Sequence, residues 1–157
     1  MKRRALALGS LTLVSGVALA ALSALGSHFM AALLHDRPNI RWDASTLVEG
    51  DLNGNGERDT AVVGYDKSGL VLAVGMGAKA QNIQYLNFPI GGTVQAAVCV
   101  APVSLAVVPL SCDPDGAKLP GCAASSHMWG LAINDRECDP VNVYWDHEKR
   151  RLAWWRN

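Results

Sequence analysis

The chain has 157 residues, with 14 basic and 14 acidic side chains, and hydrophobic residues make up 50% of it. This length leaves room for one domain and a targeting segment, but not for two sizeable cores. Three of the 14 basic residues, Lys2, Arg3 and Arg4, precede a long uncharged run, so 11 basic and 14 acidic residues remain for the rest. This mildly acidic remainder has no basic stripe, which argues against nucleic acid as a partner.

The N-terminus has the pattern of an export signal. The basic cluster is followed by an uncharged, mostly apolar run over residues 5–26, in which Ala18 and Ala20 match the small-residue cleavage pattern of a signal peptide. The same run is long enough to span a bilayer, so it could instead be retained as an anchor in the inner membrane. In both cases the basic cluster stays inside and the rest of the chain is exported, to the periplasm or beyond the cell.

These features divide the chain into three parts. We expect residues 1–26 to be a signal peptide or anchor, residues 27–40 a linker, and residues 41–157 a folded domain. Any contact with the membrane would then be made through the N-terminal segment alone.

The expected domain consists of short apolar runs, rich in β-branched residues and separated by turn residues at a spacing of about ten. Runs of this kind are typical of strands. They predict an all-β fold, a small antiparallel sandwich or meander of about eight strands, with no helix longer than two turns after the leader. The runs cover residues 46–49, 60–65, 70–74, 83–88, 93–99, 103–110, 129–133, 141–145 and 151–156.

The sharpest chemical pattern is the stretch DLNGNGERD at residues 51–59, which separates two expected strands. Carboxylate or amide side chains stand at alternate positions, and Gly56 permits a sharp turn after the third of them. Calcium prefers six to eight oxygen ligands, and a tight loop of this kind can supply several of them. The candidate ligands are the side chains of Asp51, Asn53, Asn55 and Asp59 and the backbone carbonyl of Glu57.

An EF-hand would need a bidentate Glu at position twelve of this loop, where the chain has Val62. The stretch GDLNGNGERDTAVVG instead resembles the FG-GAP or VCBS repeat of integrin-type β-propellers, D-x-[DN]-x-[DN]-G-x-x-D between two strands. The resemblance covers about residues 46–75 and implies that the five groups named above bind calcium. A propeller needs at least four blades, and the chain has one copy, so the resemblance implies a single blade-like unit in another small β fold.

The alternative is that the two Asn-Gly pairs are simply hairpin turn residues and that both aspartates are solvated. A plain turn does not need both aspartates, and we therefore expect a structural calcium site. With two carboxylates and two neutral amides, its dissociation constant should lie at about 10⁻⁴ to 10⁻³ M, the range of extracellular modules.

The four cysteines, Cys99, Cys112, Cys122 and Cys138, all lie in the C-terminal half. An even number in an exported chain predicts two disulfides, for which three pairings are possible. We favour Cys112 with Cys122 and Cys99 with Cys138. Zinc is the alternative, but no pair has the Cys-x-x-Cys spacing of a structural zinc site.

The histidines are the main candidates for catalytic residues. Ser125, His127 and Asp135 could form a hydrolase triad, but the chain lacks the Gly-x-Ser-x-Gly elbow. His147 lies in the expected turn DHEK. We therefore expect no catalytic residues, and keep a small envelope hydrolase, or an inhibitor of one, as the alternative.

Aromatic side chains gather at the C-terminus, where Trp154 and Trp155 must point to opposite faces of one strand. We take Trp155, with Arg151 and Arg156, as a possible surface for an envelope protein or glycan. The alternative is that both indoles pack under the rest of the domain. The sequence thus predicts an exported, non-enzymatic β domain with two disulfides and a structural Ca²⁺ ion.

Overall fold

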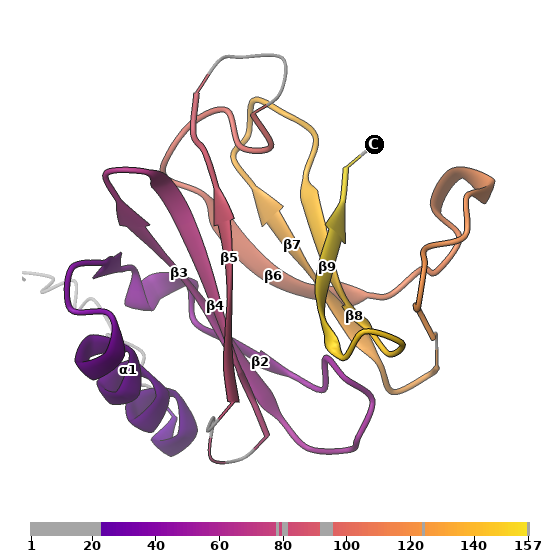
Figure 1. Cartoon of the computed structure of the whole chain (residues 1–157), viewed down its shortest axis with the longest axis horizontal. Coiled ribbons are helices and arrows are strands. Elements are labelled where there is room, and N and C mark those ends of the chain that lie inside the picture. Colours follow the sequence, from indigo (N-terminus) through magenta and orange to yellow (C-terminus); the bar gives the residue numbers. More distant parts are fainter. Residues whose placement is uncertain (1–22, 78, 80–81, 92–95, 124, 157) are drawn as a thin grey trace, which may run out of the picture.

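The computed structural model describes residues 23–77, 79, 82–91, 96–123 and 125–156. The expected leader up to residue 22 and the first part of the expected strand 93–99 lie outside the described residues. Within the described part, nine antiparallel strands form two sheets, and one α-helix lies beside the first sheet, at the left in Figure 1. The elements are α1 (Ala24–Asp36), β1 (Arg41–Trp42), the 3₁₀ turn η1 (Ala44–Thr46), β2 (Val48–Gly50), β3 (Asp59–Asp66), β4 (Gly69–Met76), β5 (Asn82–Phe88), β6 (Ser104–Pro109), the 3₁₀ turn η2 (Pro114–Gly116), β7 (Trp129–Asn134), β8 (Val141–Asp146) and β9 (Arg151–Trp155).

The first sheet has the order β1-β3-β4-β5, and β2 pairs with the same edge of β3 as β1 does. β1 lies against Gly64 and Tyr65, whereas β2 lies against residues 59–61, so the edge is made by two short strands. The second sheet is a meander in the order β6-β7-β8-β9. This arrangement confirms the all-β, antiparallel fold expected from the sequence.

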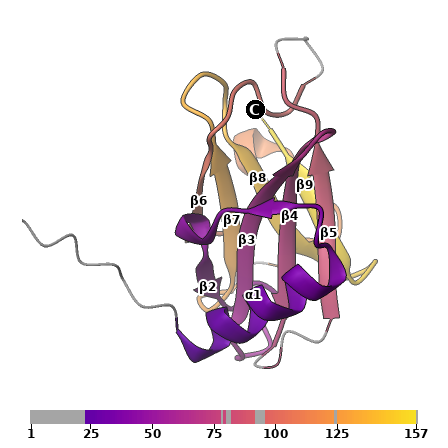
Figure 2. The same ribbon diagram turned by 90° about the vertical axis from the view of Figure 1, so that its left-hand side faces the viewer.

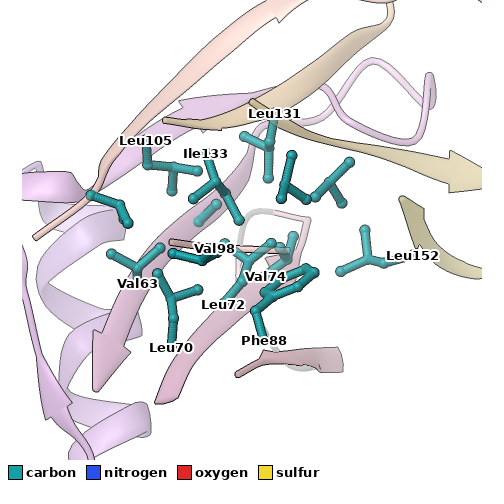
Figure 3. Packing of buried hydrophobic residues seen from close by; sticks show 14 of the residues in the cluster. Val63, Leu70, Leu72, Val74, Phe88, Val98, Leu105, Leu131, Ile133 and Leu152 are labelled. Carbon is teal, nitrogen blue, oxygen red and sulfur yellow. The ribbon is translucent and has the colours of Figure 1, made fainter. Parts of the chain in front are cut away.

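The core lies between the two sheets (Figure 3). Alternate residues of β4 point into it, including Leu70, Leu72 and Val74, and they meet Leu131 and Ile133 of β7. The intervening residue Ala73 is also fully buried, because α1 covers the other face of the first sheet. Burial on both faces explains why β3 and β4 read as continuous apolar runs instead of alternating ones.

The helix α1 lies across the outer face of the first sheet (Figure 2). Phe29 and Leu33 are one turn apart and fully buried against Val62 and Ala73. Ser23 caps the helix by accepting a hydrogen bond from the backbone N–H of Gly26 at 2.9 Å, which satisfies one of the free donors of the first turn. The helix ends before Pro38, because the residue that precedes a proline disfavours helical backbone.

This helix corrects the expectation of a linker over residues 27–40 and of no long helix after the leader. Its apolar positions look like a continuation of the leader, yet they are spaced to bury one face against a sheet. The 13-residue helix therefore belongs to the folded domain. Among the described residues, no helix is long and apolar enough to cross a membrane.

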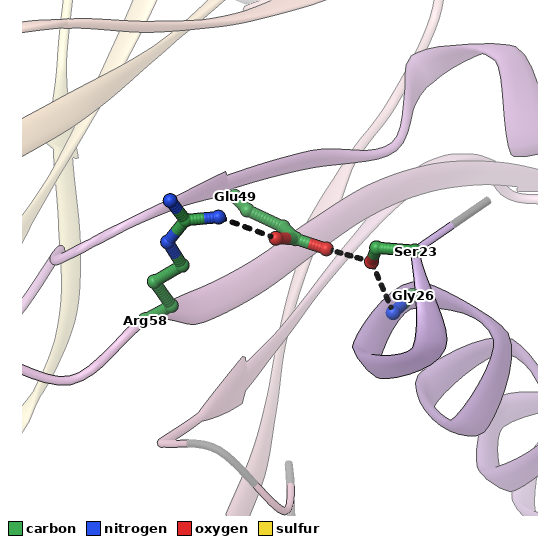
Figure 4. Close-up of polar contacts among 4 residues, drawn as sticks. All are labelled: Ser23, Gly26, Glu49 and Arg58. Carbon is green, nitrogen blue, oxygen red and sulfur yellow. Dashed lines mark hydrogen bonds and ion pairs between the residues drawn. The ribbon is translucent and has the colours of Figure 1, made fainter. Parts of the chain in front are cut away.

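A short polar network joins the start of α1 to the first sheet (Figure 4). The hydroxyl of Ser23 donates to the carboxylate of Glu49 in β2, and Arg58 lies 3.4 Å from the other oxygen of that carboxylate. Ser23 therefore caps the helix and also ties it to β2.

Candidate functional site

The 51–59 loop connects β2 to β3, and it is anchored by Leu52, which is buried in the core. The carboxylate of Asp51 organises its first half. One oxygen accepts hydrogen bonds from the N–H groups of Gly54 at 2.7 Å and Asn55 at 3.1 Å. The other oxygen accepts from Gly56 at 2.8 Å. The backbone therefore wraps around a single carboxylate.

The two asparagines repeat this arrangement at alternate positions. Asn53 Oδ1 accepts from the backbone N–H of Asn55 at 3.1 Å, and Asn55 Oδ1 accepts from that of Glu57 at 2.8 Å. Each side-chain oxygen is thus held in a defined direction by a residue two positions later. An amide oxygen has two lone pairs, so each keeps one for a further partner.

Asp59 is the last residue of the loop and is fully buried, with 0% of its surface exposed. One carboxylate oxygen accepts from the N–H of Leu52 at 2.8 Å and the other from that of Gly77 at 2.7 Å. Burial raises the pKa of the Asp59 carboxyl, the nearby Asp51 carboxylate raises it further, and these hydrogen bonds lower it in part. The Asp51 carboxylate in the loop therefore disfavours the charged form of the buried Asp59 carboxyl.

The donor set fits calcium. In the part of the chain that the structure describes, no ion pair involves Asp51 or Asp59. A carboxylate offers about four lone-pair sites, and the hydrogen bonds above leave some of them on each residue unfilled. Calcium is a hard cation that accepts such oxygens in flexible geometry.

Both predicted disulfides are formed with the favoured pairing, Cys99 with Cys138 and Cys112 with Cys122. The first lies beside the buried carboxylate of Asp135. The carboxyl group and the two cysteine sulfurs lie within 4.8 Å of one another. Within the described residues, no other side chain that could bind a metal joins this group. Since both sulfurs are bonded to each other, this group does not offer a thiolate site for zinc.

The possible triad is not assembled. Asp135 accepts hydrogen bonds from four backbone N–H groups, those of Cys99, Val100, Glu137 and Cys138. Burial alone raises the pKa of its carboxyl, but together these bonds hold that pKa below the usual value. His127 approaches Ser125 through its backbone N–H at 3.4 Å, and both side chains are exposed. His147 is exposed in the β8–β9 turn.

The C-terminal aromatic residues differ from the expected surface. Trp154, not Trp155, is the exposed indole at 47%, and it packs edge-on against Phe88 at 5.5 Å. Trp155 is half-buried against Tyr144, with ring centroids 5.7 Å apart.

The two arginines of that expected surface also separate. Arg156 turns inward and donates to the carbonyl of Ala96 at 2.8 Å. Arg151 remains exposed and lines a shallow groove with Trp154. The three residues grouped from the sequence therefore do not form one surface.

A feature missed from the sequence lies beside the loop. A partly open cavity of about 660 Å³ has walls from the loop, the end of β4, the start of β5 and the β8–β9 hairpin. Asn82, Trp145 and Arg150 contribute to it together with Asn55 and Glu57. The residues come from four separate segments with no common motif, so only the closed sandwich assembles them.

Comparisons with known proteins add no relatives: no protein-family model matches the chain, and neither curated proteins nor solved structures gave a match.

Proposed function

We propose that the protein is an exported, non-enzymatic binding domain of the cell envelope in which the 51–59 loop holds a structural calcium ion. The two disulfides indicate an oxidising, exported location. We assign no catalytic residue, and Asp135 of the triad considered from the sequence is bonded to backbone N–H groups. The leader, cleaved or retained, would decide whether the domain is released or held at the inner membrane.

The observation that carries the calcium proposal is the pair of carboxylates at Asp51 and Asp59. Burying an ionised carboxylate is costly unless a positive charge or hydrogen bonds compensate it. Here a second carboxylate lies close enough to raise the pKa of Asp59, and no basic partner is present among the described residues. A divalent cation would neutralise both charges.

The remaining ligands come from the oxygens at alternate loop positions, those of Asn53 and Asn55 and the Glu57 carbonyl. When bound, calcium supplies positive charge and an oxygen-preferring coordination sphere. The resemblance to a single FG-GAP or VCBS unit stays a prediction, and the antiparallel arrangement of β2, β3 and β4 around the loop is compatible with it. The ion would then stiffen the β2–β3 connection and, through Asp59, the turn after β4.

Calorimetric titration of the disulfide-bonded domain with calcium chloride tests this proposal. We expect a single site with a dissociation constant of about 10⁻⁴ to 10⁻³ M. Replacing both aspartates, Asp51→Ala with Asp59→Ala, should abolish the binding heat.

Asp66→Ala is the matched control, because Asp66 also accepts a backbone hydrogen bond in a tight turn, from Ser68 at 2.7 Å. It should leave the titration unchanged. Equal calcium binding by the wild type and the double variant would contradict the proposal.

A further inference from the structure

The cavity beside the loop has a lining suited to a ligand with many hydroxyl groups. Asn82 presents an amide, which offers both donors and acceptors, and Asn55 presents the donors of its amide nitrogen. Glu57 adds an acceptor, and Arg150 adds several donors. A sugar hydroxyl both donates and accepts, so it can pair with every one of these groups.

The charge of the cavity favours an uncharged ligand. Glu57 and Arg150 both line it, and among the described residues no ion pair joins them. One negative and one positive group leave the lining without net charge. A phosphate or polyanion would meet the carboxylate as well as the guanidinium, which disfavours it.

Trp145 supplies a flat aromatic wall. Its indole is half-buried and packs against the core, and it also lines the cavity. A pyranose ring has an apolar face of C–H groups, which an aromatic ring can cover while the hydroxyls bond at the edges. Packing against the core keeps this wall rigid, so little side-chain entropy is lost on binding.

The amide of Asn55 and the backbone of Arg150 are held in place by hydrogen bonds. The amide oxygen of Asn55 accepts from the N–H of Glu57, which orients the amide nitrogen away from that bond. The carboxylate of Glu57 lies over Gly77, where a Cβ atom would come within 2.8 Å of its Oε2. Gln84 of β5 joins the two sheets. Its side chain donates to the Arg150 carbonyl and accepts from the N–H of Leu152 in β9 at 2.9 Å.

We propose that this cavity binds an uncharged oligosaccharide, with one sugar ring against Trp145 and its hydroxyls on Asn55, Asn82, Glu57 and Arg150. The inference names a ligand class for the binding role proposed above and rests on it. It does not require calcium, although the ion would order the loop that carries Asn55 and Glu57.

Calorimetry with two soluble probes tests it: a β-linked tetramer of N-acetylglucosamine and a β-linked tetramer of glucose. We expect at least one of them to bind. Removing a hydrogen-bonding side chain should weaken binding about fivefold or more for Asn82→Ala and for Arg150→Ala. Trp145→Phe, which retains an aromatic ring in the core, should weaken it less than Trp145→Ala.

Arg136→Ala is the matched control for Arg150→Ala. Both arginines are exposed and have positive φ angles, 70° at Arg136 and 51° at Arg150, and alanine keeps the Cβ atom at each, so the two substitutions affect the backbone alike. Arg136 does not line the cavity, and its variant should bind as the wild type does. Trp154→Ala removes an indole that does not line the cavity, and this variant should bind as the wild type does.

The outcomes separate this inference from the calcium proposal. Sugar binding that Asn82→Ala and Arg150→Ala weaken supports it, whether or not calcium binds. Absence of binding by both probes in the presence of calcium overturns it, even if calcium itself binds. Sugar binding that these two variants leave unchanged overturns it as well, because the sugar would then sit elsewhere.

Discussion

The carboxylate of Asp59 accepts a hydrogen bond from the backbone N–H of Gly77 at 2.7 Å, and this bond joins the 51–59 loop to the turn after β4. A second bond, from Leu52 at 2.8 Å, ties the same carboxylate to the start of the loop. One buried side chain therefore connects two segments that border the proposed ion site and the cavity. Substitution of Asp59 should therefore affect both the proposed ion site and the cavity.

Stability should depend on pH through Asp59, with a sign that calcium reverses. Because the folded pKa of this carboxyl is raised above 3.8, the folded state holds its proton more tightly than the unfolded state does. Without calcium, the wild type should therefore gain stability relative to Asp59→Asn as pH falls from 7 toward 4. With saturating calcium the charged form is favoured in the folded state, so the wild type should instead lose stability relative to Asp59→Asn over this pH range.

Urea unfolding of both proteins at several pH values, in chelator and in calcium, measures this difference. Asp135 titrates in the opposite sense because its folded pKa is lowered, but it is present in both proteins and cancels in the comparison. A wild type that loses stability relative to Asp59→Asn on acidification in chelator would contradict the assignment.

Gly77 should be needed for the position of Glu57 as well as for backbone geometry. Gly77 has a φ of 70° and Gly116 has a φ of 77°, so alanine at either position should cost about 1–2 kcal/mol of folding free energy. A Cβ atom at Gly77 would also displace the end of the Glu57 side chain, whereas one at Gly116 would meet nothing within 4 Å.

We therefore expect both alanine variants to lose similar stability, but only Gly77→Ala to bind the oligosaccharide more weakly. Denaturant unfolding and calorimetry on the two purified variants check the two expectations separately. Equal sugar affinity in the two variants would argue against Glu57 as a ligand-facing group.

The helix α1 should contribute strongly to stability. Phe29 is fully buried beneath it, and Phe29→Ala should cost about 3–5 kcal/mol. Leu34 lies on the same helix with 56% of its surface exposed, so Leu34→Ala should change stability by less than about 0.5 kcal/mol. Urea unfolding distinguishes the two, and a small effect of Phe29→Ala would mean that α1 is detached in solution.

The two disulfides should differ in how much they contribute to the free energy of unfolding. Cys99 and Cys138 are separated by 39 positions and Cys112 and Cys122 by 10. Loop-closure entropy of the unfolded chain then predicts losses of about 4 kcal/mol for the first and about 3 kcal/mol for the second. Paired Cys→Ala substitutions and denaturant unfolding check this order. A larger loss from the Cys112–Cys122 pair would show that packing of the loop between these two cysteines outweighs chain entropy.

The strands could be predicted from the sequence because their apolar runs are short and end at turn residues. The runs at 60–65, 70–74 and 141–145 lie within β3, β4 and β8. The grouping of the strands into two sheets could not be predicted, since it depends on contacts between distant segments. The helix was missed for a related reason: its apolar residues adjoin a leader of the same character, and the sheet that buries Phe29 lies far along the chain.

The two tryptophans show where strand pattern alone fails. Alternation correctly places Trp154 and Trp155 on opposite faces, but it does not say which face is open. Trp154 pairs with Val143 on the inner face, yet β9 is an edge strand and its indole reaches the rim. Trp155 lies on the outer face, where it packs against Tyr144 and is half-buried.

The dependence of folding stability on calcium tests the central claim most directly. For a dissociation constant of about 1 mM, 10 mM calcium should raise the unfolding free energy by about 1.4 kcal/mol relative to chelator. The double variant Asp51→Ala, Asp59→Ala should show no such increase. An unfolding curve of the wild type that is the same in chelator and in 10 mM calcium would contradict a calcium site in the 51–59 loop.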